Sequence, residues 1–196
     1  MVTYVKNNFL LVLIIVLLLF VVSSYARFNT KVTTDEIYGM CAPMAVNTSF
    51  CYEFMKSIPQ IATLDIYDLT KFLINYDFQI TLDLTKHFQS LTNNTTDRSS
   101  KDSYKLCLDL FSLIDPLETA LKALAANDYD TLNTNIGVMS QYAEECGSEL
   151  SSIIKPISKL SKGVSIVENV SDIVLVISEC FLRKKKFDVR NHYPNL

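Results

Sequence analysis

The sequence predicts an all-α protein, an up-down-up-down four-helix bundle with a helical hairpin in front of it and two intrachain disulfides. Apolar residues recur at three- and four-residue spacing along four long stretches, as they do on one face of an α-helix. No stretch alternates apolar and polar residues over the length of a strand, and the 196 residues include only four glycines, few for a β protein with many tight turns. Four of the five cysteines fall where antiparallel helices would bring them together in pairs. In chain order, the predicted parts are a signal peptide (1–26), a hairpin extension (27–64), the bundle (65–185) and a polar C-terminal tail (186–196).

The first 26 residues have the three parts of a secretory signal peptide. Lys6 precedes an almost purely apolar run from Phe9 to Val22, and small residues at the −3 and −1 positions place a cleavage site after Ala26. A transmembrane anchor is the alternative, but about 14 apolar residues fall short of the roughly 20 that span a bilayer. Export would allow disulfides to form in the mature chain.

A short helical hairpin is predicted to open the mature chain. Thr33 and Glu36 fit a capping box, so a first helix would start there and run to about Met44. A second short helix would begin near Thr48 and stop before Pro59.

Cys41 and Cys51 lie about five residues on either side of the break between these helices, so they would stand level in the hairpin. A disulfide needs Cα atoms within about 7 Å of each other, which this arrangement allows. Closing so short a loop would stabilise the fold by roughly 3 kcal/mol. Because the hairpin has little core of its own, this bridge is expected to decide whether the hairpin forms.

The first bundle helix is predicted from about Asp65 to Leu91. Its apolar stripe consists of Ile66, Leu69, Leu73, Tyr76, Ile80, Leu84, Phe88 and Leu91. Residues 93–102 are polar and hold no periodic apolar residue, so they are predicted to form a solvated loop. The Asp and Glu side chains of the bundle are expected to face solvent.

The next two helices are predicted from about Ser103 to Ala126 and from about Asp130 to Leu150, with turn and N-cap residues between them. Pro116 lies inside the first of these helices and is expected to kink it, because proline removes a backbone donor and clashes with the preceding turn. The apolar stripe of the second helix consists of Leu132, Ile136, Met139, Ala143, Cys146 and Leu150.

Cys107 and Cys146 lie on the stripes of these two helices, about 20 residues before and about 19 residues after the reversal near Asn127. At roughly 1.5 Å per residue both would stand about 30 Å from the turn, and so level with each other. A bridge between them is predicted, and its loop of about 40 residues would contribute roughly 4 kcal/mol. Two buried free thiols are the alternative, and four cysteines allow three pairings.

The last helix is predicted to span about Val164 to Lys185. Residues 151–163, which contain Pro156, are predicted to connect it to the preceding helix. Cys180 is left over and falls among the apolar residues of the last helix, where it would be a buried free thiol. An intermolecular disulfide is the alternative for this cysteine.

The basic run 183–186 ends this helix and makes the charge uneven. Residues 27–182 hold 12 basic and 20 acidic residues, whereas residues 183–196 hold five basic and one acidic. Cations at a helix C-terminus complement the macrodipole, and an anionic partner such as pectin or a membrane surface is the alternative. The acidic body suits a basic protein partner and argues against nucleic acid.

No catalytic, metal or cofactor site is predicted. The two histidines, His87 and His192, are not paired with Cys, Asp or Glu at metal-ligand spacing. The chain holds no H-E-x-x-H, no phosphate-binding glycine loop and no G-x-S-x-G. We therefore expect a protein that is not an enzyme and needs no cofactor. An enzyme with no recognisable motif is the alternative, which convergent carboxylates with perturbed pKa values in a cleft would favour.

Four N-x-S/T sequons, at Asn47, Asn93, Asn94 and Asn169, are candidate glycosylation sites in an exported chain. Because the sequons of Asn93 and Asn94 overlap, only one glycan is expected there.

The cysteine frame resembles that of the plant invertase and pectin methylesterase inhibitor family. The shared features are a signal peptide, a Cys-x9-Cys helical hairpin and two further cysteines about forty residues apart on antiparallel helices. Shorter stretches also look like that family, namely residues 107–111, 120–124, 128–129, 133–146 and 156–159. The resemblance covers nearly all of the mature chain and gives an inhibitor domain of about 33–185. Residues 137–140 and 147–150, on either side of the fourth cysteine, depart from the family pattern, which bears on target affinity more than on the fold.

This resemblance implies a secreted inhibitor that blocks the substrate cleft of a carbohydrate enzyme in a one-to-one complex. The expected target is pectin methylesterase, with acid invertase as the alternative, because the Pro-Lys-Phe turn of some invertase inhibitors is absent from residues 126–129. The expected location is the apoplast, with the vacuole as the alternative, and without a stable membrane anchor once the signal peptide is removed. A secreted bundle that binds a small ligand or lipid in an apolar cavity is a further hypothesis.

Overall fold

The computed structural model of the chain describes residues 31–43, 47–153 and 158–183. Its elements in chain order are α2 (Thr34–Cys41), α3 (Thr48–Ser57), the 3-10 helix η1 (Pro59–Thr63), α4 (Ile66–Asn94), α5 (Arg98–Phe111), α6 (Asp115–Ala125), α7 (Tyr129–Ser151), α8 (Ser158–Ile177) and the π-helix η2 (Ser178–Leu182). An isolated antiparallel β-bridge pairs Lys31 with Asp65. None of the helices in these ranges is long and apolar enough to cross a membrane. The predicted signal peptide and polar tail lie outside the described residues.

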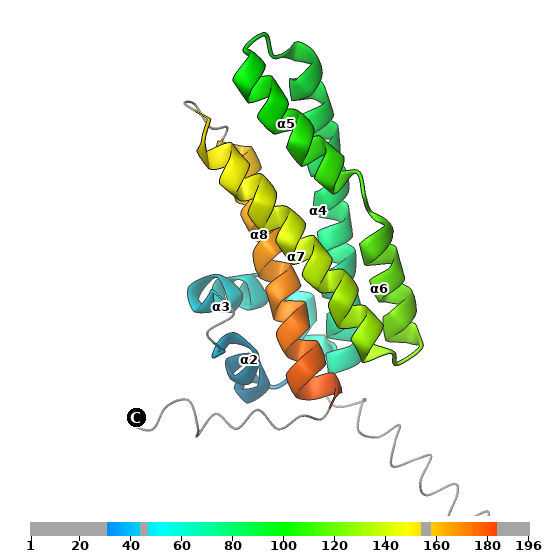
Figure 1. Ribbon diagram of the computed structural model, residues 1–196. Coiled ribbons are helices and arrows are strands. Elements are labelled where there is room, and N and C mark those ends of the chain that lie inside the picture. Colours follow the sequence, from blue (N-terminus) through cyan, green and yellow to red (C-terminus); the bar gives the residue numbers. More distant parts are fainter. Residues whose placement is uncertain (1–30, 44–46, 154–157, 184–196) are drawn as a thin grey trace, which may run out of the picture.

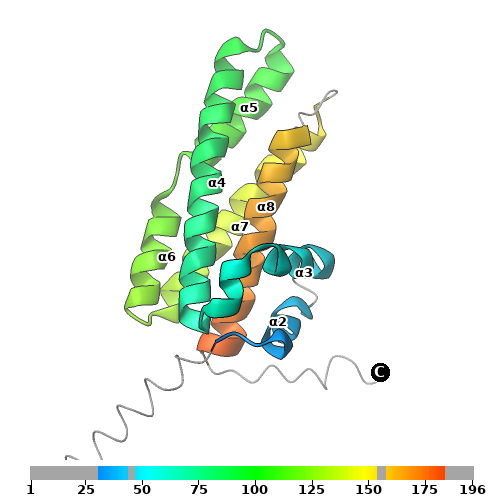
Figure 2. The same cartoon turned by 180° about the vertical axis from the view of Figure 1, so that it is seen from behind.

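The helices form the predicted bundle, with the hairpin at its side (Figure 1). The helices α4, α7 and α8 run along the length of the bundle, and α5 and α6 follow one another along its fourth edge. Within this arrangement α7 packs against α6 and α8, and α4 packs against α5 and α8. The view from behind in Figure 2 shows the hairpin α2–α3 lying beside α8. The up-down-up-down topology therefore holds, with one edge built from two helices.

Side-chain caps fix where most of these helices begin. Five residues accept a hydrogen bond from the backbone N–H three positions later, namely Thr33, Asn47, Asp65, Asp97 and Asp128. The capping box at α2 is confirmed, because Thr33 N donates to Glu36 Oε2 at 2.8 Å while Glu36 N donates to Thr33 Oγ1 at 3.2 Å. The loop between α4 and α5 is shorter than the predicted 93–102, because α4 continues to Asn94 and α5, capped by Asp97, begins at Arg98.

The predicted kink at Pro116 is instead a complete break between α5 and α6. Proline has no N–H, and its ring clashes with the carbonyl four residues earlier, which kinks or breaks a helix, and here the helix is broken. Pro116 lies in the first turn of α6, where proline is tolerated. At the end of α5, the carbonyl oxygen of Phe111 accepts a hydrogen bond from Thr85 Oγ1 of α4 at 3.0 Å. The broken edge is thus held to its neighbour by a side chain.

The connector before α8 is shorter than predicted. Because α8 begins at Ser158, Gly163 lies inside the helix, and residues 154–157 lie outside the described ranges. A Cβ on Gly163 would stand 2.9 Å from Cδ2 of Leu84, so α4 and α8 approach closely here. At its other end α8 passes into the π-helix at Ser178.

The apolar stripes meet in the centre of the bundle. On α7 the stripe is buried at every predicted position, which are Leu132, Ile136, Met139, Ala143, Cys146 and Leu150. On α4 the predicted positions Leu69, Leu73, Leu84 and Phe88 are buried, and the other four are partly buried. The same helix also buries Asp77 at 0% exposure, so the expectation that acidic side chains face solvent is wrong for this residue.

Replacing Gly137 with alanine should raise the free energy of unfolding by about 0.5–1 kcal/mol. Gly137 lies inside α7 with no atom within 4 Å of an added Cβ, and alanine is the better helix former. Gly163→Ala is the matched control, because its new Cβ must displace the Leu84 side chain and should lower stability. Urea unfolding followed by circular dichroism measures both variants. A gain in both would mean that the approach of α4 to α8 does not require glycine.

Candidate binding surface

The described ranges contain no group of three or more His, Cys, Asp or Glu side chains that could hold a metal ion. His87 is exposed on α4, with Nδ1 2.7 Å from the carbonyl oxygen of Asp83 one turn earlier. His192 lies outside the described residues. The features of functional interest are therefore the surfaces that another molecule could contact and the crosslinks that hold them.

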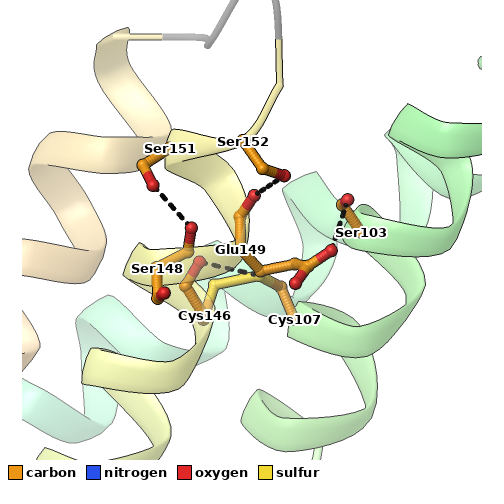
Figure 3. The surroundings of a disulfide bond; sticks show 7 residues. All are labelled: Ser103, Cys107, Cys146, Ser148, Glu149, Ser151 and Ser152. Carbon is orange, nitrogen blue, oxygen red and sulfur yellow. Dashed lines mark hydrogen bonds between the residues drawn. A yellow bond between two sulfur atoms is a disulfide. The ribbon is translucent and has the colours of Figure 1, made fainter.

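Figure 3 shows the Cys107–Cys146 disulfide, which joins α5 to α7 with Cα atoms 5.0 Å apart. Both cysteines are fully buried, and the pairing is the one that the sequence predicts. Ser103 Oγ, one turn earlier on α5, donates to Glu149 Oε1 of α7 at 2.8 Å. The 3.5 Å approach of Cys107 Sγ to the carbonyl oxygen of Cys146 is a contact only, because a bridged sulfur has no hydrogen to donate. This end of the bundle is thus tied at two points.

The second disulfide, Cys41–Cys51, joins α2 to α3 with Cα atoms 5.5 Å apart, again as the sequence predicts. The base of the hairpin is closed by a backbone hydrogen bond of 2.9 Å from Val32 N to Leu64 O, where the chain enters and leaves. The hairpin is therefore a closed unit, crosslinked near its middle and hydrogen-bonded at its base.

The outer side of the hairpin carries an exposed aromatic ring. Tyr38 is 58% exposed, and its ring meets that of Tyr52 edge-on with centroids 4.6 Å apart. Lys56 Nζ lies 5.4 Å from the centroid of Tyr52. On the inner side, a Cβ on Gly39 would stand 3.3 Å from the ring of Phe181 in η2, so α2 packs closely on the end of α8.

Three carboxylates gather where α7 meets α8, namely Glu144 on α7 and Glu168 and Asp172 on α8. Ser140 Oγ of α7 donates to Asp172 Oδ1 at 2.8 Å. Burial, together with the charges of Asp172 and Glu144, raises the pKa of Glu168. Burial also raises the pKa of Asp172. The hydrogen bond from Ser140 lowers this pKa in part, and the charge of Glu144 raises it further. The negative charge of this face therefore grows as pH rises through the acidic range.

An apolar groove of about 320 Å³ lies between α4 and α8. Its apolar lining comes from Ile80, Leu84, Leu91, Leu160 and Gly163, and its polar lining from Asp83, His87, Ser90 and Lys159. The groove has the volume that the ligand-binding hypothesis requires, but it opens at the surface rather than inside the core. Its lining includes both the carboxylate of Asp83 and the ammonium group of Lys159.

The first residue of the basic run is tied to two acidic side chains. Arg183, whose side chain is only 18% exposed, pairs with Asp130 at the start of α7 and with Glu179 in η2, the latter at 3.0 Å. Asn133 Nδ2 of α7 donates to the same carboxylate of Glu179. Arg183 therefore locks η2 to α7, which is more than the helix-dipole role that the sequence predicts. Residues 184–186 lie outside the described ranges.

Cys180 is free and half-buried, so it is more accessible than the buried thiol that the sequence predicts. Burial, with the charge of Glu179 adding to it, raises the pKa of its thiol. A thiol with a raised pKa is a poor nucleophile, which does not favour the intermolecular disulfide.

Three of the four sequon asparagines, Asn47, Asn93 and Asn94, are exposed. Asn169 is only 8% exposed, and its Nδ2 donates to the carbonyl oxygen of Ser165 at 2.6 Å. A glycan on Asn169 would have to displace this packing, so we expect the exposed sites alone to carry glycans.

The sequence places the four bridged cysteines correctly, but the carboxylate face was not predicted from it. One signal was present, because Glu168 and Asp172 are like charges one helical turn apart, a spacing that is unfavourable without a further reason. The contact of Asp172 with Ser140, which is 32 residues away, has no sequence signal.

Comparison with known proteins shows which family shares this sequence pattern. A family model described as plant invertase/pectin methylesterase inhibitor matches residues 35–177. The chain is 29% identical over 173 residues to a pectinesterase inhibitor from Actinidia deliciosa, covering 88% of this chain and 93% of the relative. It is 27% identical over 179 residues to pectinesterase inhibitor 2 from Arabidopsis thaliana, covering 91% of this chain and 98% of the relative.

Solved structures agree with the sequence matches. The crystal structure of mutant form A of a pectin methylesterase inhibitor from Arabidopsis superposes with a TM-score of 0.68 at 26% identity, covering 74% of this chain and 95% of that one. A second structure, of a pectin methylesterase inhibitor from Arabidopsis thaliana, gives a TM-score of 0.58 at 25% identity, covering 76% of this chain and 97% of that one.

Proposed function

Because the chain belongs to the plant invertase/pectin methylesterase inhibitor family, we propose that it is a secreted inhibitor of pectin methylesterase, which it binds one-to-one at the substrate cleft. The observation that supports this most is the match of the disulfide-braced bundle to pectin methylesterase inhibitors over most of their length. These relatives are inhibitors and not enzymes. Acid invertase is the alternative target within the family, and the apoplast is the proposed location.

The rigidity of the bundle suits this role. A binding surface that is ordered before association loses little conformational entropy when it binds, and so more of the contact energy appears as affinity. Here the Cys107–Cys146 bridge and the Ser103–Glu149 hydrogen bond hold α5 and α7 together, and Arg183 holds η2 to α7. A partner would meet helices whose relative positions are already set.

The charge of the bundle supports a protein partner with a basic surface. The excess of acidic residues before position 183 would steer such an enzyme toward the bundle at low ionic strength. Part of that charge lies on the α7–α8 carboxylates, whose protonation falls as pH rises. Association should therefore depend on both salt and pH.

The proposal is tested with the oxidised, secreted chain in assays of pectin methylesterase and of acid invertase from pH 4.5 to 7. We expect inhibition of the methylesterase alone, complete at one inhibitor per enzyme, with a complex of that composition on gel filtration. The same chain after reduction and alkylation is the matched control and should inhibit neither enzyme. Inhibition of invertase alone would show that the target is acid invertase and not pectin methylesterase. Inhibition of neither enzyme by a chain with an intact helical circular dichroism spectrum would overturn the proposal.

A further inference from the structure

A carboxylic acid lies in the middle of the bundle core. Asp77 is fully buried at the centre of α4, on the side that packs against α8. Ser171 Oγ of α8, also fully buried, donates to Asp77 Oδ2 at 2.9 Å. The other oxygen, Asp77 Oδ1, is buried and has no hydrogen-bond partner. A carboxylate can accept several hydrogen bonds, so a single donor leaves most of its capacity unused.

Within the described ranges, no positively charged side chain forms an ion pair with Asp77. The neighbouring core positions on α4 are Ile74 and Thr81, both at 0% exposure. The helices α5, α6 and α8 and the π-helix η2 all contact α4, and of these α8 contributes the carboxylate of Asp172, which repels negative charge.

Burial under these conditions favours the neutral acid. Moving an unpaired carboxylate out of water is costly, whereas a protonated carboxyl group loses far less solvation. Burial therefore raises the pKa of Asp77 well above its usual value, the field of Asp172 adds to this, and the hydrogen bond from Ser171 offsets only part of it. A protonated carboxyl also gains an O–H donor, which the ionised form lacks.

We propose that Asp77 is a built-in proton switch: the fold holds this residue protonated, so the packing of α4 on α8 is most stable in an acidic medium and loses stability as the pH rises. The switch lies inside the fold and not on a binding surface, so it does not depend on which enzyme the protein inhibits. Its effect would nevertheless limit any inhibitory activity to conditions in which the bundle is firmly folded.

The sign of the pH dependence follows from proton binding. Aspartate in an unfolded chain has a pKa of about 3.9, so below that pH both states hold the proton and stability is at its full value. Above it the unfolded chain releases the proton while the folded chain keeps it, and so the unfolding equilibrium constant rises about tenfold for each pH unit. The rise ends where the folded carboxyl group itself ionises.

The test compares urea unfolding of the wild type with that of Asp77→Asn between pH 4 and 8. The carboxamide has the same shape and can still accept from Ser171, but it cannot ionise. We expect the unfolding constant of the wild type, relative to that of the variant, to rise about tenfold for each pH unit from pH 4 until the folded carboxyl group ionises. Asp109→Asn, at an exposed position of α5, is the matched control and should follow the wild type. Parallel curves for wild type and Asp77→Asn would overturn the proposal.

A second measurement can be made on the wild type itself. In the wild type, the ¹³C signal of the Asp77 side-chain carboxyl should stay in its protonated position well above pH 4. Titration near pH 4, as for an exposed aspartate, would overturn the proposal. Ser171→Ala removes the hydrogen bond that favours the ionised form, so it should move this titration to a still higher pH.

Discussion

Replacing Cys107 and Cys146 together with alanine lowers the free energy of unfolding by about 4 kcal/mol. The bridge joins positions 39 residues apart. A closed loop of this length lowers the conformational entropy of the unfolded chain, so the chain loses less entropy on folding, which stabilises the fold by about this amount. Urea unfolding at pH 5, followed by circular dichroism, measures the loss. Since a domain of this size has only about 5–15 kcal/mol in all, the variant should unfold at a much lower urea concentration.

Cys180→Ala is the matched control for this prediction, because it removes a thiol of similar size that closes no loop. We expect its midpoint to change by less than a quarter of the shift caused by the double substitution. A loss below about 1 kcal/mol in the double variant would show that the unfolded chain is already constrained in this region, and that the bridge adds little.

Phe111→Ala should cost about 3–5 kcal/mol, the usual range for truncating a fully buried phenylalanine. Phe111 ends α5, and its ring stacks on that of Phe88 of α4 with centroids 6.1 Å apart. The substitution removes this contact and leaves a cavity at the point where the fourth edge of the bundle is broken. Thermal and urea unfolding should both show the loss.

Leu113→Ala, two residues later, tests whether the effect depends on burial. Leu113 is 49% exposed in the break between α5 and α6, so its truncation should change stability by no more than about 0.5 kcal/mol. Equal losses in the two variants would mean that the break, and not the packing of Phe111 on Phe88, determines stability here.

Much of the fold follows from local sequence. The structure contains the capping box at Thr33, the cap at Asp65 and the complete stripe of α7. Each of these features depends on residues that are only three or four positions apart in the sequence. Pro116 was recognised as a disruption, but its consequence depends on what stabilises the broken ends. That support comes from Thr85 of α4, which is 26 residues away from Phe111 and therefore invisible to local pattern.

The features that were missed depend on contacts between distant helices. Asp77 was expected to face solvent because it is acidic, although it lies four residues after the buried Leu73. The hydrogen bond from Ser171, 94 residues later, has no sequence signal. The pairing of Arg183 with Asp130 spans 53 residues in the same way. The cysteine pairs could be predicted because the two partners of each pair lie at nearly equal numbers of residues from the same turn. The residues of the surface clusters are not related by a shared turn in this way.

The exposed break at Leu113 lies between the two cysteines that the longer disulfide joins. An extracellular protease that nicked the backbone there would release no fragment, because the piece before the nick keeps Cys107 and the piece after it keeps Cys146. Both sulfurs belong to residues with 0% exposure, which shields the link from reductants in solution. This exposed interruption of the bundle is thus also one where a single cut leaves the molecule covalently whole.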